Sequence, residues 1–245
     1  MKITFLGTSD GVPRKNHFCS ATMIEVKDRL YLIDAGAPVI DLMLKEGKHP
    51  DMLRAFFNTH PHTDHTDGII PLVTLAGWHY LNAAFDLFVA DDSVTDAIVS
   101  YYEIITREKY PGDRLRHKTI TEGTFYDDGY IKVSAIPTRH CPPMPSYAFI
   151  VEAEGKRAVF SGDMSYLLRA NDFPDKEITA GADLFVCEMA HFGAEELLPY
   201  IKECGAKRVI FNHYQARKTE DIASLAGLGL PFAISAANDG DVLEL

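Results

Sequence analysis

The segment from Phe56 to His65 constrains the chain more than any other part of the sequence. It contains three histidines and an aspartate within six positions, namely His60, His62, His65 and Asp64. The apolar run from Leu53 to Phe57 predicts a strand that ends where this cluster begins. Each buried imidazole or carboxylate needs a partner, and a divalent metal ion would serve all four. The structural alternative is a polar turn in which Thr63 or Asp64 starts a helix.

Length and composition place this segment in an ordinary globular protein. The chain has 245 residues, 47% hydrophobic and 24% charged, which suits one domain over residues 1–245. The formal net charge of -11 disfavours broad capture of nucleic acid, which requires lysine and arginine to replace phosphate counterions. Four cysteines without a CxxC pair indicate reduced thiols in a cytoplasmic protein. With no signal peptide or apolar run of membrane-spanning length, we expect no membrane partner.

Apolar periodicity predicts strands and helices in both halves of the chain. In the first half we expect strands at 3–6, 21–26, 30–33, 53–57 and 87–89, and helices near 39–43, 69–81 and 94–105. In the second half we expect strands at 131–136, 147–152, 157–160, 184–187, 208–211, 232–234 and 242–245, and helices at 194–204 and 219–226. This order predicts two packed sheets covered by helices on the outside, a four-layer α/β sandwich.

Three further candidate ligands stand just after predicted strands, at His140, Asp163 and His213. Each of them alone is more typical of a structural residue with ordinary hydrogen bonds. Together with the histidine cluster, however, they make a set of N and O ligands too large for one zinc ion, which usually takes about four. Such a set suits two metal ions that share a carboxylate. We therefore expect two divalent ions, with Zn as the first choice and Mn or Fe as alternatives.

These motifs resemble those of the metallo-β-lactamase superfamily, whose HxHxDH signature corresponds to residues 60–65. The resemblance extends from the segment at 5–9 to the closing segment at 238–242, and it implies an αβ/βα sandwich with metals at one edge between the sheets. By the family pattern the ligands of one metal would be His60, His62 and His140. Those of the other would be Asp64, His65 and His213, with Asp163 as the bridge. Asp34 would orient a ligating imidazole.

Two features are similar to the ribonuclease Z and phosphodiesterase branch of that superfamily. The first is the opening segment from Gly7 to Pro13. The second is Glu188 with His191, whose placement is similar to that of a non-ligand catalytic histidine in ribonuclease Z and to an acid-x-x-His segment in phosphodiesterases of phosphonate breakdown. The alternative for this second feature is a polar pair at the start of a helix.

One departure from ribonuclease Z concerns the substrate. In that enzyme a long tRNA-binding arm lies between the segments that match His140 and Asp163, and here these residues are too close in sequence to hold one. The resemblance therefore favours a metal-dependent phosphodiesterase for a small phosphodiester or a cyclic nucleotide, with nucleic acid as the less favoured partner. Asp64 and Asp163 would orient the attacking water, while His191, tuned by Glu188, would protonate the leaving oxygen or contact the phosphate.

Other functions stay open at this point. The enzymatic alternatives are a ribonuclease Z-like RNA endonuclease and a lactone or thioester hydrolase. The non-enzymatic alternative is a metal-binding or redox-sensing protein. The oligomeric state is also open, and a homodimer is one option.

Overall fold

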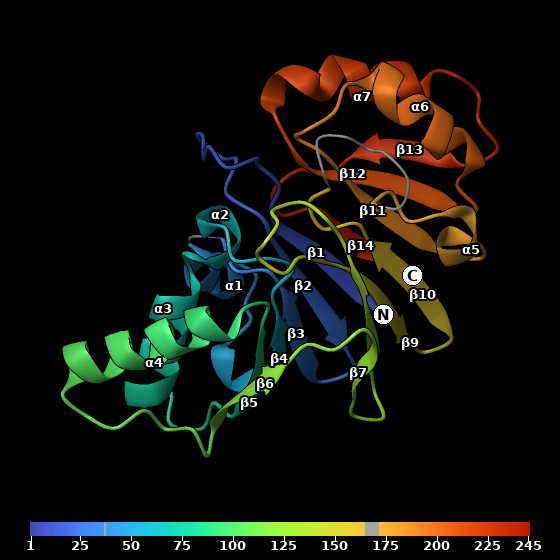
Figure 1. Cartoon of the computed structure of the whole chain (residues 1–245). Helices are drawn as coiled ribbons and strands as arrows, with labels where there is room; N and C mark the ends of the chain where they lie inside the picture. Colours follow the sequence, from blue (N-terminus) through green and yellow to red (C-terminus); the bar gives the residue numbers. More distant parts are fainter. Residues whose placement is uncertain (37, 165–171) are drawn as a thin grey trace.

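The computed structural model describes residues 1–36, 38–164 and 172–245. Its strands form two seven-stranded sheets that pack face to face (Figure 1). In spatial order the first sheet contains β14 (Val242–Glu244), β1 (Lys2–Gly7), β2 (Ala21–Val26), β3 (Arg29–Ile33), β4 (Leu53–Phe57), β5 (Phe85–Val89) and β6 (Leu115–Thr119). The second contains β13 (Ala233–Ala236), β12 (Arg208–Tyr214), β11 (Leu184–Met189), β10 (Lys156–Phe160), β9 (Tyr147–Ala153), β8 (Lys132–Pro137) and β7 (Gly123–Asp127).

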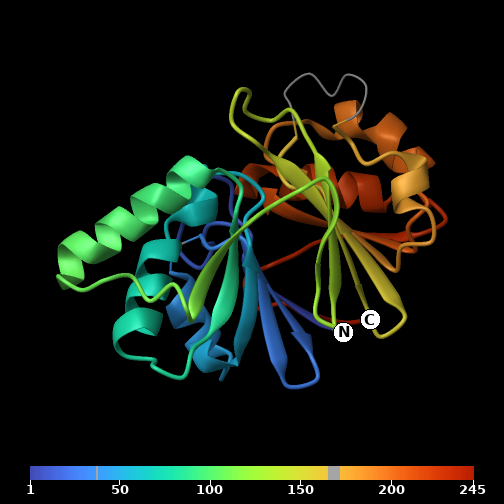
Figure 2. The ribbon, with the colours of Figure 1, turned by 60° about the horizontal axis from the view of Figure 1, so that its bottom comes forward.

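The helices cover the outer faces of the two sheets (Figures 1 and 2). Those of the first half are α1 (Val39–Lys45), α2 (Thr63–Thr66), α3 (Ile69–Trp78) and α4 (Asp92–Thr106), with the 3-10 turn η1 (Pro50–Met52). Those of the second half are α5 (Lys176–Thr179), α6 (Ala194–Glu203) and α7 (Thr219–Ala226), with η2 (Ala216–Lys218). The predicted four-layer α/β sandwich is therefore confirmed. Among the described helices, none is both long and apolar enough to cross a bilayer.

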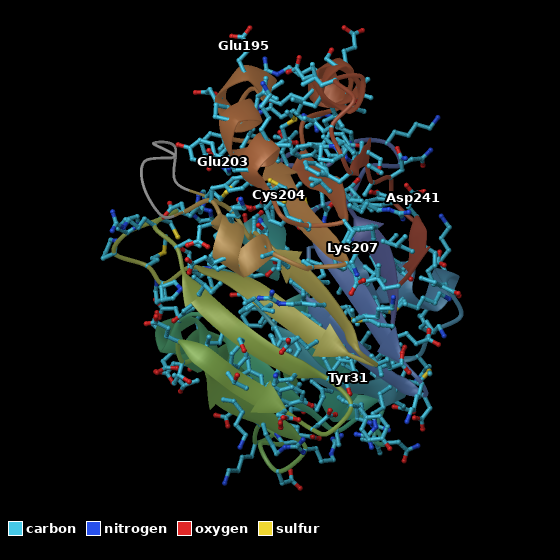
Figure 3. The ribbon with its side chains drawn as sticks, turned by 90° about the vertical axis from the view of Figure 1, so that its right-hand side faces the viewer. Tyr31, Glu195, Glu203, Cys204, Lys207 and Asp241 are labelled. Carbon is cyan, nitrogen blue, oxygen red and sulfur yellow. The ribbon has the colours of Figure 1, made fainter. Side chains whose placement is uncertain are left out.

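Three apolar cores separate the four layers. Side chains alternate along a strand, so Phe56 of β4 packs against the helices of the first half while Phe57 packs between the sheets. The third core lies beneath α6, which turns Leu197 towards the second sheet. Figure 3 shows the opposite, charged face of α6, where Glu195 points to solvent. Strands buried on both faces read as continuous apolar runs, which explains why the sequence revealed them.

The sequence prediction missed two of the four edge strands, although it included β13 and β14. It missed β6 and β7, because edge strands carry polar residues such as Arg116 and Lys118 and lack the apolar alternation that marks an interior strand. It also extended the second predicted helix to residue 81, whereas the corresponding α3 ends at Trp78. The backbone amides of His79 and Tyr80 both donate to the carbonyl of Leu75, which closes the helix there.

Parallel pairing determines where functional loops gather. In the first sheet β3, β4, β5 and β6 run parallel, and in the second sheet β10, β11, β12 and β13 do. The carboxyl ends of neighbouring parallel strands lie at the same edge of a sheet, which is where α/β proteins place their ligands. The histidine motif after β4, Asp163 after β10 and Glu188 near the end of β11 therefore share one end of the sandwich.

Candidate metal centre

The histidine motif lies directly beyond the carboxyl end of β4, as the sequence predicts. His60 is buried in the loop after the strand, and His62 is the residue before α2. Asp64 and His65 lie in α2 itself, so the short helix of the alternative interpretation is present as well. This helical turn brings His65 back beneath the loop, where its ring centroid lies 4.1 Å from that of His60. The turn therefore serves to gather the motif into one cluster.

His60, His62 and His140 form the first group of candidate ligands. Nδ1 of His62 lies 3.0 Å from Nε2 of His60 and 3.3 Å from Nε2 of His140. These three ring nitrogens lie within 4.8 Å of one another. His140 reaches the motif from the loop that follows β8 in the second sheet, so the group spans both sheets.

Asp64, His65 and His213 form the second group. Oδ2 of Asp64 lies 3.4 Å from Nε2 of His65 and 3.8 Å from Nε2 of His213. These three atoms also lie within 4.8 Å of one another. The two groups are those that the resemblance implies, and the tertiary structure alone brings their distant members together.

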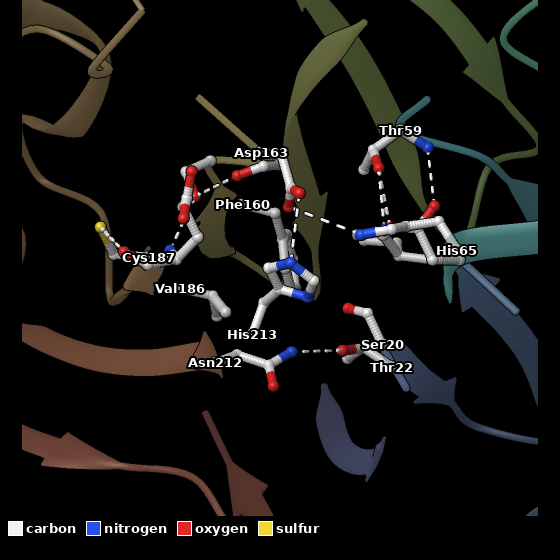
Figure 4. Close-up of a pocket in the computed structure, with 15 residues that line it drawn as sticks. Ser20, Thr22, Thr59, His65, Phe160, Asp163, Val186, Cys187, Asn212 and His213 are labelled. Atoms are coloured by element: carbon white, nitrogen blue, oxygen red, sulfur yellow. Dashed lines mark hydrogen bonds and ion pairs between the residues drawn. The ribbon is translucent and has the colours of Figure 1, made fainter. Parts of the chain in front are cut away.

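Asp163 lies between the two groups. Its Oδ2 is 3.8 Å from Nε2 of His60 and 3.7 Å from Nε2 of His140 on one side, and 3.1 Å from Nε2 of His213 on the other. Its Oδ1 is 3.5 Å from Nε2 of His65. Figure 4 shows Asp163 facing both His65 and His213. The carboxylate is 3% exposed and thus has the position of a shared ligand.

His213 corrects one detail of the sequence prediction, which placed it beyond a strand that ends at Phe211. β12 continues to Tyr214, so His213 lies within the strand. Its φ of +54° belongs to the left-handed region, and the pairing of β12 with β11 shifts register at this point, where Met189 faces Tyr214. Such an irregularity redirects a side chain that a regular strand would point elsewhere. It turns the imidazole towards Asp163.

Protein acceptors fix the orientation of three imidazoles. Nδ1 of His140 lies 3.0 Å from the carbonyl oxygen of Met164, and Nδ1 of His65 lies 2.8 Å from Oδ2 of Asp34. Because a carbonyl and a carboxylate only accept, each of these Nδ1 atoms carries the proton. Nδ1 of His60 lies 3.1 Å from Oγ1 of Thr59, whose own hydrogen goes to Asp34. In all three rings Nε2 is therefore the nitrogen directed to the cluster.

Asp34 is the centre of this supporting network, in agreement with the role that the resemblance implies. It has a φ of +58° at the end of β3 and is 3% exposed. Its Oδ1 accepts from the amide nitrogen of Thr59 at 2.8 Å and from Nδ2 of Asn58 at 3.1 Å. Sequence reasoning missed Asn58 and Thr59 as site residues, although two polar residues between an apolar strand and the histidine motif were a usable signal. The structure buries both of them.

Burial and the neighbouring charges set the protonation of the cluster. Burial, with the adjacent imidazole of His65, lowers the pKa of His60 to about 2, and burial also lowers the pKa of His62. Burial alone would raise the pKa of Asp163, but His213 and His65 outweigh it and hold that pKa well below its usual range. Conversely, burial alone would lower the pKa of His65, but the carboxylates of Asp163 and Asp34 outweigh burial and raise that pKa well above its usual value. Without a cation, the cluster thus combines neutral imidazoles at His60 and His62 with a protonated His65 beside buried carboxylates that keep their charge.

These residues fit a bound cation. Nε2 of His65 and Oδ1 of Asp163 are buried and have no hydrogen-bond partner among the described residues. The Nε2 of His60 and Nδ1 of His62, only 3.0 Å apart, present lone pairs to each other unless a proton or cation lies between them. A metal ion supplies a partner to all of these atoms, and it takes the place of the proton that His65 otherwise holds. Imidazole and carboxylate donors without thiolate suit Zn, Mn and Fe.

Glu188 and His191 lie beside the cluster. Both carboxylate oxygens of Glu188, which is 2% exposed, lie 2.9 Å from Nδ1 of His191. The same carboxylate accepts from the amide nitrogen of Met164 at 2.7 Å. Burial lowers the pKa of His191, but the hydrogen bond to Glu188 outweighs it and the pKa is raised. Nδ1 of His191 is 4.0 Å from Oδ2 of Asp163, so the pair predicted from the sequence does adjoin the candidate ligands.

The chain matches known proteins in sequence and in fold. Over residues 1–230 the chain matches the protein family described as Anti-Pycsar protein Apyc1. The chain belongs to this family. Among curated relatives, ribonuclease Z of Synechococcus sp. (strain WH7803) is 30% identical over 166 residues, which are 65% of this chain and 50% of that protein. The chain spans about half the length of the first curated relatives that it matches.

Solved structures establish which fold the family member adopts. The metallo-β-lactamase fold protein YhfI from Bacillus subtilis superposes with a TM-score of 0.79 at 20% identity, covering 99% of both chains. The short form of human tRNase Z superposes with a TM-score of 0.74 at 19% identity, covering 100% of this chain and 99% of that one. The chain therefore has the metallo-β-lactamase fold, and the resemblance drawn from the sequence motifs is confirmed.

Proposed function

We propose that the protein is a phosphodiesterase with two divalent metal ions, and that it hydrolyses a small phosphodiester such as a cyclic nucleotide. The observation that carries this proposal is the position of Asp163 between two groups of three candidate ligands. His60, His62 and His140 would hold one ion and Asp64, His65 and His213 the other. When bound, such ions polarise a phosphoryl group and lower the pKa of water.

The protein's own residues supply orientation and a proton. Asp64 and Asp163 are the carboxylates nearest the space between the two groups, so they would direct the attacking water towards phosphorus. Asp34 holds the Nδ1 proton of His65, which keeps Nε2 of that ring facing the cluster. Glu188 holds the Nδ1 proton of His191 in the same way, and its charge favours the imidazolium form. His191, with a side chain 15% exposed, would donate a proton to the leaving oxygen.

A small substrate agrees with the shape of the chain between His140 and Asp163. That segment forms the antiparallel pair β9 and β10, two interior strands of the second sheet. The described residues between these two ligands therefore make no protruding arm of the kind that binds tRNA. The net charge of -11 likewise disfavours a polyanion.

An RNA endonuclease is the second candidate function, because curated relatives bear the name ribonuclease Z. The expected distinction is in substrate size. In the proposed enzyme, phosphate contacts come from the metal cluster and from His191, and the net charge of -11 disfavours an extended contact with a long strand.

The test is a comparison of substrates with the metal-loaded protein. Bis(p-nitrophenyl) phosphate and a 3′,5′-cyclic nucleotide should be hydrolysed with a higher kcat/KM than a lactone, a thioester or a β-lactam at matched metal content. Asp163→Ala serves as the control for contaminating activity. Pre-tRNA should be cleaved poorly. Efficient 3′ trailer removal from pre-tRNA would support the endonuclease instead, and faster turnover of the lactone or thioester would overturn the assignment to phosphodiesters.

A further inference from the structure

The turn that carries His191 is held between two opposite charges. On one side, Oε2 of Glu188 accepts from the amide nitrogens of Ala190 and His191 at 3.0 and 3.1 Å. On the other side, Nζ of Lys218 donates to the carbonyl oxygens of Ala190 and Phe192 at 3.0 and 2.5 Å. The N–H groups of the turn thus point at a carboxylate and its carbonyl groups at an ammonium. Charge-assisted hydrogen bonds of this kind are stronger than neutral ones.

Lys218 reaches the turn from the segment that follows β12, the strand next to β11 in the second sheet. It is the last residue of η2, which follows β12 directly, and β12 carries His213. The amide nitrogen of Lys218 donates to the carbonyl oxygen of Gln215 at 2.8 Å, which fixes the backbone from which the side chain starts. Residues 213 to 218 therefore connect a candidate metal ligand to the His191 turn by a short, hydrogen-bonded path.

The ammonium group of Lys218 is partly removed from water, which costs hydration free energy, so its hydrogen bonds to the turn must offset that loss. Lys218 is half-buried, and burial, opposed by the charge of Glu188, lowers its pKa. Its neighbour Arg217 is exposed, and its Nε donates to Oε1 of Gln215, two residues away, at 2.5 Å. A lysine needed only for solubility would have the environment of Arg217, because a charged group loses favourable hydration when it is buried.

We propose that Lys218 is a positioning residue that holds the imidazole of His191 in place for proton donation to the leaving group. This inference rests on the proposed function, in which His191 is the proton donor. Glu188 sets which nitrogen of His191 carries the proton, and Lys218 sets where the turn, and hence the ring, lies. Without Lys218, two carbonyl groups lose their charged donor, and the hydrogen bond from Nε2 of Gln215 to the carbonyl oxygen of Ala190, 3.5 Å long, remains on that side. A general acid is sensitive to such a loss because its proton must be aligned with the leaving oxygen.

The sequence offered no signal for this role. Lys218 lies in a polar segment with Arg217 and Thr219, and a charged residue in such a segment is usually a solvated surface residue. Only the folded chain places its ammonium 3.0 Å from a backbone oxygen of the segment beside His191.

The experiment compares Lys218→Met, which keeps length but removes charge, with Lys218→Arg, which keeps a cation. Arg217→Met is the matched control, one position away. With zinc-loaded protein, Lys218→Met should lower kcat for an alkyl phosphodiester about tenfold, the lower end of the usual effect of losing a supporting contact. It should change kcat for a p-nitrophenyl ester, KM and zinc content much less, because p-nitrophenolate leaves without a proton. Lys218→Arg should recover part of the loss, and Arg217→Met should match the wild type.

A second measurement separates failure of this inference from failure of the proposed function. In a proton NMR spectrum the Nδ1 proton of His191, bonded to Glu188, should give a downfield signal that Lys218→Met broadens and Arg217→Met leaves intact. If the wild type hydrolyses no phosphodiester, the proposed function fails and this signal still decides the role of Lys218. An unchanged signal in Lys218→Met, or equal slowing of both esters, would overturn the inference. If Lys218→Met does not fold, Lys218→Gln takes its place in both measurements.

Discussion

Asp34→Asn is the most direct test of how the candidate metal centre is supported. The two carboxylate oxygens accept four hydrogen bonds, two from the backbone and hydroxyl of Thr59, one from Asn58 and one from Nδ1 of His65. Asparagine adopts a φ near +58° as readily as aspartate does, so the backbone has no reason to change. An amide, however, offers one oxygen and one NH₂ group. The NH₂ group must then face one of two pairs of donors, either the Thr59 amide with Nδ2 of Asn58 or the Thr59 hydroxyl with Nδ1 of His65.

The structure sets the size of the effect. Leaving a buried donor without an acceptor costs about 1–3 kcal/mol, and two such donors cost roughly 2–6 kcal/mol. For a chain of this length we expect the melting temperature to fall by at least about 5 °C. If the NH₂ group faces His65, its Nδ1 can no longer donate, and the proton moves to Nε2, the atom that faces Asp64 and Asp163. Metal affinity should then fall on the order of 10–100-fold.

The assay has two parts. Competition with a chromophoric chelator gives the zinc affinity, and thermal unfolding of the metal-free protein gives the stability. Asp41→Asn, which changes an exposed aspartate on α1, is the control and should alter neither quantity. Wild-type zinc affinity together with an unchanged melting temperature in Asp34→Asn would refute the reasoning, because each orientation of the amide predicts the loss of one or the other.

Three further predictions concern other parts of the structure. Asp163→Ala should release at least one of the two expected metal ions while the fold persists, and elemental analysis that finds a single ion in fully loaded, active wild-type protein would contradict the two-metal proposal. His191→Ala should slow hydrolysis of an alkyl phosphodiester by on the order of a hundredfold or more and that of a nitrophenyl ester much less, with metal content unchanged. Glu188→Gln should repeat this pattern more weakly. If His191→Ala instead slows both esters equally, mainly by raising KM, His191 is a phosphate contact. Asp128→Ala should reduce the free energy of unfolding by about 1–3 kcal/mol at pH 7, because Oδ2 of Asp128 accepts from the buried hydroxyl of Tyr31 at 2.7 Å. Burial alone would raise the pKa of Asp128, but this hydrogen bond, those from nearby backbone amides and the charge of Arg29 outweigh burial and lower the pKa. The stabilisation by Asp128 is therefore complete above the ordinary carboxyl pKa of about 3.9, and it is lost as the pH falls through the lower pKa of the folded protein. Urea unfolding at pH 7 and pH 3 should show a smaller difference from the wild type at pH 3, and a difference that does not change with pH would argue against the charged form of Asp128 as its source.

Much of the fold and of the candidate site follows from local patterns in the sequence. β3 and β4 are buried on both faces, so their apolar runs are continuous, and the polar residues that follow them stand out. The positions of His60, His62, Asp64 and His65 beyond β4 are decided by a few adjacent residues. Local patterns of this kind can be recognised without knowledge of any distant contact, which is why these features could be predicted.

Contacts between distant residues decided the rest. The polar edge strands β6 and β7 exist because neighbouring strands accept their hydrogen bonds, and their sequences alone do not show this. The bulge that turns His213 towards Asp163 depends on the pairing of β12 with β11. The ammonium of Lys218 acquires its role because the exit of β12 folds back over the His191 turn. Each of these features requires two segments to meet, and the sequence of either segment carries no information about the other's position.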